Sequence, residues 1–171
     1  TALCQNEAEG EQLARPMISE IISRLGDIVY STVGESLPET CARMLTDDGQ
    51  TLAIAESCTG GLVASELVAI PGCSKFLLEA CVTYSDAAKV SRLGVRQETL
   101  DQFGAVSEQC AREMAEGMRK ISGADYALAT TGYAGPDGGT EENPVGTIYI
   151  ALARPGETLV KRISLFGDRA R

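Results

Sequence analysis

Three side chains able to act in catalysis stand together in the segment AESCTGGLVASELV, residues 55–68. Ser57, Cys58 and Thr59 follow an apolar stretch and precede two glycines and a helical pattern. A serine or cysteine at such a strand-to-helix turn is placed to attack a carbonyl carbon, because the first N–H groups of the helix can stabilise an oxyanion. The same residue types also cap helices, so the segment fits a cap as well as a nucleophile.

The sequence contains no histidine, which limits the bases that could activate a nucleophile. Ser-His-Asp and Cys-His catalysis are therefore excluded within this chain. Lys89 is the best candidate base, in the segment TYSDAAK, and Tyr84 is placed to hold or relay the proton. Taken alone, each residue favours a structural role instead: Lys89 that of a solvated helix lysine, and Tyr84 that of a half-buried strand aromatic.

A glycine-rich loop, TGYAGPDGGT at residues 131–140, follows another apolar stretch. It lacks the G-K-[ST] ending of a phosphate-binding P-loop, so by itself it indicates only a turn. However, the segments at 57–61, 83–89 and 131–140 all follow predicted strands. Ligands of open α/β sheets bind at the carboxyl ends of strands, so we expect these three loops to form one site.

Apolar periodicity predicts strands that alternate with helices. Strands are expected at 51–57, 76–84 and 126–132, followed by a hairpin of strands at 147–153 and 158–166. Helices are expected at 36–46, from residue 60 to before Pro71, at 86–93 and at 107–120. Ser36, Ser85 and Ser107 are the predicted caps. This order predicts an α/β fold with a mixed sheet.

The composition narrows the class of protein. The net charge of −9 and the isoelectric point of about 4.6 argue against nucleic acid as a partner, because a basic footprint is missing. No apolar run approaches the roughly 20 residues that span a bilayer, and no secretory signal is visible at the start. Six cysteines form no C-x-x-C pair. We interpret them as reduced core cysteines of a cytoplasmic protein, with Cys81 and Cys110 on apolar faces.

Six motifs follow one another in an order and spacing typical of one family: ESCTGG, VTYSDAAK, LGV, GAVSE with AREMAEG, TGYAGPDGG with PVGTIYIAL, and FGDR. Together they resemble the CinA C-terminal domain family, the nicotinamide mononucleotide (NMN) amidohydrolases. The resemblance covers about residues 34–171. It implies a three-layer α/β/α domain there with a mixed, mostly parallel sheet. Residues 1–33 resemble a linker or the tail of a domain that precedes this one in longer CinA proteins.

The resemblance also implies a reaction, in which NMN and water give nicotinic acid mononucleotide and ammonia. It implies a cytoplasmic homo-oligomer that needs no metal and no cofactor. Ser57 corresponds to the nucleophile, Lys89 to the base and Tyr84 to the assisting residue. The reaction starts from neutral Lys89, so activity is expected to fall at acid pH. The expected substrate-binding residues are Cys58, Thr59, Gly60, Gly61, Thr131, Gly132 and Arg169. Within this set, the N–H groups of residues 58–61 are expected to hold the oxyanion, and Thr59 to cap the helix.

The sequence departs from the family pattern at two places. Tyr133 stands where the family usually has isoleucine, which is expected to reshape one wall of the site. The sequence ends at Arg171, where family members normally continue into a basic C-terminal helix. Two other functions therefore stay open: a catalytically silent module that binds a pyridine nucleotide or a protein partner, and a redox-sensitive regulator that uses Cys58.

Overall fold

The computed structural model describes residues 4–165. The chain divides into two compact units, with the boundary after Cys41. Each unit is described by itself below.

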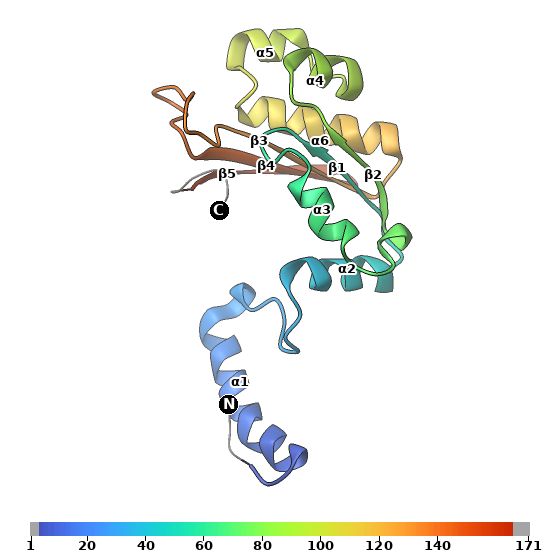
Figure 1. Ribbon diagram of the computed structural model, residues 1–171, viewed down its shortest axis with the longest axis vertical. Coiled ribbons are helices and arrows are strands. Elements are labelled where there is room, and N and C mark those ends of the chain that lie inside the picture. The colour runs from blue at the N-terminus through green and yellow to red at the C-terminus, as the bar shows by residue number, and fades with distance from the viewer. Residues whose placement is uncertain (1–3, 166–171) are drawn as a thin grey trace. The chain divides into compact units, whose positions relative to one another are not determined.

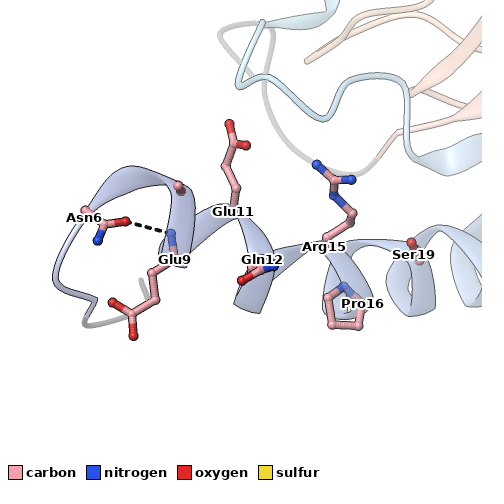
Figure 2. Close-up of a pocket in the computed structure, with 8 residues that line it drawn as sticks. Asn6, Glu9, Glu11, Gln12, Arg15, Pro16 and Ser19 are labelled. Carbon is pink, nitrogen blue, oxygen red and sulfur yellow. Dashed lines mark hydrogen bonds between the residues drawn. The ribbon is translucent and has the colours of Figure 1, made fainter.

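The first unit contains one long helix, α1 (Glu7–Leu25), followed by the short 3-10 helix η1 (Gly26–Ile28). The Asn6 side chain caps α1 by accepting a hydrogen bond from the N–H of Glu9 at 3.0 Å. None of the residues of α1 is buried. Figure 2 shows a pocket that α1 and its cap line, and it contains none of the predicted catalytic residues.

The second unit is built on a five-stranded mixed sheet in the order β2-β1-β3-β4-β5. Its strands are β1 (Leu52–Glu56), β2 (Leu77–Val82), β3 (Tyr126–Gly132), β4 (Thr147–Arg154) and β5 (Glu157–Ser164). The strands β2, β1 and β3 are parallel, whereas β4 and β5 are added antiparallel. The carboxyl ends of β2, β1 and β3 therefore meet at one edge of the sheet.

Helices cover both faces of this sheet (Figure 1). One face carries α3 (Leu62–Val68) and the part of α2 (Leu37–Asp47) that begins at Ala42, with the 3-10 helix η2 (Cys73–Lys75) nearby. The other face carries α6 (Glu108–Ser122), next to α4 (Asp86–Leu93) and α5 (Gln97–Phe103). The three-layer α/β/α arrangement expected from the sequence is thus confirmed.

Strand β1 shows how the alternation of side chains builds two cores. Ala53 and Ala55 face α6, whereas Leu52 and Ile54 pack on the side of α2 and α3. The core under α6 is rich in alanine, and its two methionines, Met114 and Met118, are fully buried. A core made of alanines and aliphatics is what a sequence with few aromatic residues and no tryptophan requires.

The boundaries of the expected elements lie within two residues of those predicted. The helix expected from residue 60 begins at Leu62, because Gly60 and Gly61 both adopt positive φ angles, 61° and 103°. Helix α5 was not expected at all. Among the described helices, none is long and apolar enough to cross a membrane.

Candidate active site

Ser57 is the first residue after β1 and stands at the turn into α3. Its N–H donates to the carbonyl of Thr130 at 3.0 Å, which continues the pairing of β1 with β3 by one residue. Its own carbonyl accepts from the N–H of Gly60 at 3.1 Å and so closes a tight turn. The positive φ angles of Gly60 and Gly61 belong to the left-handed region, which suits glycine. The sequence Ser-Cys-Thr-Gly-Gly therefore fixes the serine backbone at the sheet edge.

The amine of Lys89 reaches this serine at the same edge of the sheet. Lys89 lies on α4 and is only 1% exposed, while Ser57 is 8% exposed. The Nζ atom lies 3.2 Å from Ser57 Oγ, and it donates to the carbonyl oxygens of Thr83 at 3.0 Å and Tyr84 at 3.1 Å. The structure thus joins the predicted nucleophile and the predicted base in a buried contact.

The partners of Lys89 decide what its amine can do. The two carbonyl oxygens of Thr83 and Tyr84 can only accept hydrogen bonds. A neutral amine has two hydrogens and one lone pair, so both hydrogens point to the carbonyls when it is deprotonated. The lone pair then faces the third neighbour, the hydroxyl of Ser57. This arrangement suits a general base that removes the proton of Ser57.

Helix α4 holds Lys89 in place through signals that are visible in the sequence. The Ser85 side chain accepts a hydrogen bond from the N–H of Ala88 at 3.2 Å, which confirms the predicted cap. The helix ends at Gly94, whose φ of 70° is left-handed. Lys89 therefore follows the cap by about one turn, and its side chain points back toward the carbonyls that precede the helix.

Tyr84 contributes to the site differently from the expected proton relay. Its contact with Lys89 runs through its main-chain carbonyl, at 3.1 Å. The side chain of Tyr84 is 60% exposed, at the rim of the site. An exposed ring beside a buried nucleophile is placed to touch a substrate, and the relay role stays a prediction.

Thr59 does not cap α3, and this expectation was wrong. The N-cap residue is Gly61, because the two glycines shift the start of the helix to Leu62 and leave Thr59 too far from the first free N–H groups. The hydroxyl of Thr59 instead shares a hydrogen bond of 2.7 Å with that of Thr130. Thr59 therefore ties the turn to β3.

The carboxylate of Glu56 takes the place of the cap. Its oxygens accept hydrogen bonds from the N–H groups of Gly61, Val63 and Ala64, at 2.9, 3.2 and 2.8 Å. The expected oxyanion donors at Gly60 and Gly61 are thus paired, with Ser57 and Glu56 respectively. An oxyanion would have to take these N–H groups from their present acceptors. Cys58, also expected at the site, is partly exposed.

This role of Glu56 was not expected from the sequence. The signal is a glutamate that ends an apolar strand and precedes a Gly-Gly turn into a helix. Neither the capping pattern S-x-x-E nor a pair of opposite charges predicts this role. The N–H groups of α3 donate to a side chain of the strand that precedes the helix, which neither pattern describes.

The last two residues of β3 supply packing at the same edge of the sheet. Thr131 is 1% exposed, and its hydroxyl donates to the carbonyl of Ala105 at 2.7 Å. Gly132 has no room for a side chain, since a Cβ atom there would lie 2.6 Å from the carbonyl oxygen of Thr147. Both residues thus hold β3 against its neighbours, and their contact with substrate stays a prediction. Arg169 lies outside the described residues.

The cysteines differ from the expected core set. Cys110 is buried, but Cys58, Cys73 and Cys81 are only partly buried, and Cys4 and Cys41 are exposed. No disulfide joins the cysteines that the structure describes. No group of three or more His, Cys, Asp or Glu side chains in residues 4–165 has the geometry to hold a metal ion.

Comparison with known proteins places the chain in a family. Residues 34–171 match the model of the CinA C-terminal domain. A putative competence-damage inducible protein of Clostridium perfringens is 50% identical over 169 residues, 99% of this chain and 41% of that protein. Another of the same name, from Acetivibrio thermocellus, is 49% identical over 171 residues, again 41% of its length. The chain thus spans about two fifths of these relatives.

Solved structures similar to this chain come from the same family. A competence-damaged protein (CinA) superfamily protein from Escherichia coli is 39% identical, with a TM-score of 0.76, and the match covers 78% of each chain. The competence damage-inducible protein A of Klebsiella pneumoniae is 45% identical, with a TM-score of 0.74 over 76% of this chain and 81% of that one. The sequence motifs, the fold and these relatives lead to one conclusion: the chain belongs to the CinA C-terminal domain family.

Proposed function

We propose that this chain hydrolyses the carboxamide of NMN and releases nicotinic acid mononucleotide and ammonia. The observation that carries the proposal is the buried contact of 3.2 Å between Lys89 Nζ and Ser57 Oγ. A serine hydrolase without histidine needs a base of this kind in contact with its nucleophile. Membership of the CinA family supports the choice of substrate, through the resemblance of the motifs to NMN amidohydrolases.

The proposed reaction begins when neutral Lys89 takes the proton of Ser57 and Ser57 Oγ bonds to the carboxamide carbon. Lys89 then gives that proton to the nitrogen, the C–N bond breaks and ammonia leaves. Water attacks the acyl-serine while Lys89 accepts one of its protons. The C–O bond to Ser57 breaks and Ser57 recovers a proton from Lys89. The second proton of the water passes to the released ammonia, so the products are a carboxylate and ammonium.

The test is ammonia release from NMN by the wild-type chain and by Ser57→Ala and Lys89→Met variants. We expect each substitution to lower kcat by at least about 10³-fold, because removal of a nucleophile or its base disables the covalent route. Ser91→Ala and Lys120→Met are matched controls, since both side chains are exposed on helices of the same domain, and they should keep wild-type rates.

Two results would contradict the proposal. Equal ammonia release by the wild-type chain and Ser57→Ala would move the nucleophile elsewhere, and Cys58→Ala would be measured next. Binding of NMN by calorimetry without any ammonia release would favour the silent nucleotide-binding module.

A further inference from the structure

Glu56 is the charged group nearest in sequence to the proposed nucleophile, and it is almost completely buried. Its exposed fraction is 1%. Three main-chain N–H groups at the start of α3 donate to its two carboxylate oxygens, those of Gly61, Val63 and Ala64. No described lysine or arginine forms an ion pair with it.

A buried carboxylate without a cationic partner is costly, because the charge loses its hydration. Here the cost is offset by the three N–H donors and by the positive end of the helix dipole. A serine side chain at the N-cap of the helix itself would satisfy fewer N–H groups, and it would not connect the helix to the strand. The carboxylate of Glu56 thus connects the end of β1 to the start of α3.

The main chain of Glu56 makes a second connection, toward the base. Its carbonyl accepts a hydrogen bond from the N–H of Thr83 at 2.8 Å, and the Thr83 carbonyl accepts one from Lys89 Nζ at 3.0 Å. The residue that follows Glu56 is Ser57 itself. A single residue therefore anchors the turn that carries the nucleophile and the segment that aims the base.

We infer that Glu56 is a positioning residue, whose carboxylate holds the turn of residues 57–61 so that Ser57 Oγ stays in contact with Lys89 Nζ. This inference rests on the proposed function and adds to it a residue that does not touch substrate. It also explains why the turn needs two glycines: the chain must double back so that the N–H of Gly61 reaches the side chain of Glu56.

Glu56→Gln is the variant that tests the role of the carboxylate most directly. A glutamine has the same size, but its amide has one accepting oxygen and one donating nitrogen. The nitrogen would face an N–H donor of α3, so the turn must shift. A displacement of about 1 Å at a reacting atom can cost about 100-fold in rate. The matched control is Glu66→Gln, which removes the same charge from an exposed position on α3.

The first readout does not need NMN. Phenylmethanesulfonyl fluoride forms an ester with an activated serine and releases fluoride, and intact mass spectrometry follows the modification. We expect the rate constant at Ser57 to fall about 100-fold in Glu56→Gln and to stay within twofold of wild type in Glu66→Gln. Ser57→Ala identifies the modified residue. A Glu56→Gln rate within twofold of wild type, or a wild-type chain that is not modified at Ser57, would overturn the inference.

The second readout uses NMN and separates positioning from general damage. We expect Glu56→Gln to lower kcat about 100-fold and to change KM by less than threefold, because the substrate does not touch Glu56. Loss of NMN turnover in the wild-type chain with normal sulfonylation would contradict the proposed function alone. If Glu56→Gln does not fold, Glu56→Asp decides: it keeps the charge with a shorter reach, and a wild-type sulfonylation rate there would refute the inference.

Discussion

Lys89 combines deep burial with three hydrogen-bond partners, of which two are carbonyls that precede its own helix. The carbonyls fix the direction of the amine, and Ser57 occupies the remaining direction. This explains at the level of single atoms how a chain without histidine can present a base to a serine.

The cysteines give a prediction at the residue scale. Burial raises the pKa of the Cys110 thiol to about 12, and this effect outweighs the nearby charge of Lys89, which lowers it. The thiolate is the reactive form, so Cys110 should resist alkylation in the folded protein. With iodoacetamide at pH 8, we expect exposed Cys41 to be modified at least tenfold faster than Cys110, as measured by peptide mass spectrometry.

The control for this experiment is the same reaction in concentrated guanidinium chloride, where both cysteines should react at similar rates. Equal rates in the native protein would show that Cys110 is not buried as described.

The sequence predicted that Ser57 and Lys89 lie together, because each residue carries a local signal. Ser57 and Lys89 both follow apolar strands, and Ser85 marks the start of the helix that holds Lys89. Glu56 and the burial of Thr131 could not be predicted, because both depend on contacts between elements. The cap at Thr59 was mispredicted for the same reason: a more distant carboxylate competes for the same N–H groups.

At the scale of elements, the three helices with a predicted serine cap were found where expected. Helix α3 has no side-chain cap at its N-cap residue but was predicted from its apolar pattern, and α5 was missed. Ser36 and Glu39 form the expected capping box of α2, since each bonds to the main-chain N–H of the other. Helix α5 has no side-chain cap at Arg96. It is held instead by Glu113 of α6, which accepts hydrogen bonds from Arg96 and Thr99. Such a tertiary contact leaves no periodic pattern in the sequence.

The close approach of α4 and α6 gives a prediction at this scale. A Cβ atom at Gly117 of α6 would lie 1.8 Å from the carbonyl oxygen of Leu93, the last residue of α4. Alanine normally stabilises a helix by about 1 kcal/mol relative to glycine. Here we expect Gly117→Ala to lower the free energy of unfolding by about 1–3 kcal/mol, because the two helices must move apart.

Urea unfolding followed by circular dichroism measures this effect. Glu116→Ala is the matched control, since it places alanine at the neighbouring exposed position of α6 and should leave stability within about 0.5 kcal/mol. A Gly117→Ala variant more stable than wild type would show that helix propensity outweighs the contact.

At the scale of the whole molecule, the order of strands could not be predicted. The sequence indicated alternating elements and a closing hairpin, both of which the structure contains. However, β1 lies between its two parallel neighbours, β2 and β3, with cores on both of its faces, so that β3 and not β1 is the middle strand of the five. Strands of similar composition carry no local signal that ranks them across a sheet.

Stability against acid is a prediction for the whole second unit. Hydrogen bonds from the side chain and N–H of Thr51 hold the pKa of Asp125 below its ordinary value of 3.8. Burial pushes the pKa of Glu113 up, but bonds from Arg96 and Thr99 outweigh it and leave the pKa below 4.5. Both groups therefore bind protons more weakly in the folded state than in the unfolded state.

This difference in proton binding fixes the direction in which stability changes with pH. These two carboxylates stabilise the fold above their ordinary pKa values, and the contribution is lost as the pH falls through the lower folded values. We expect the free energy of unfolding to decline as the pH falls below about 5. A double variant, Asp125→Asn with Glu113→Gln, should show a shallower decline. Urea titrations at each pH measure it, with Glu116→Gln as the control for loss of charge. An unchanged slope in the double variant would contradict the assignment.

The proposed base, Lys89, and both carbonyls that bond to its amine lie within one short stretch of chain, residues 83–89. Only the proposed nucleophile, Ser57, comes from elsewhere, at the end of the neighbouring parallel strand. The stretch could therefore be transplanted as one segment. In a designed parallel sheet, it would follow the strand next to one that ends in serine, and its lysine would then contact that serine. Such a transplant would need no histidine, and the neighbouring strand would only have to set the spacing between the two side chains.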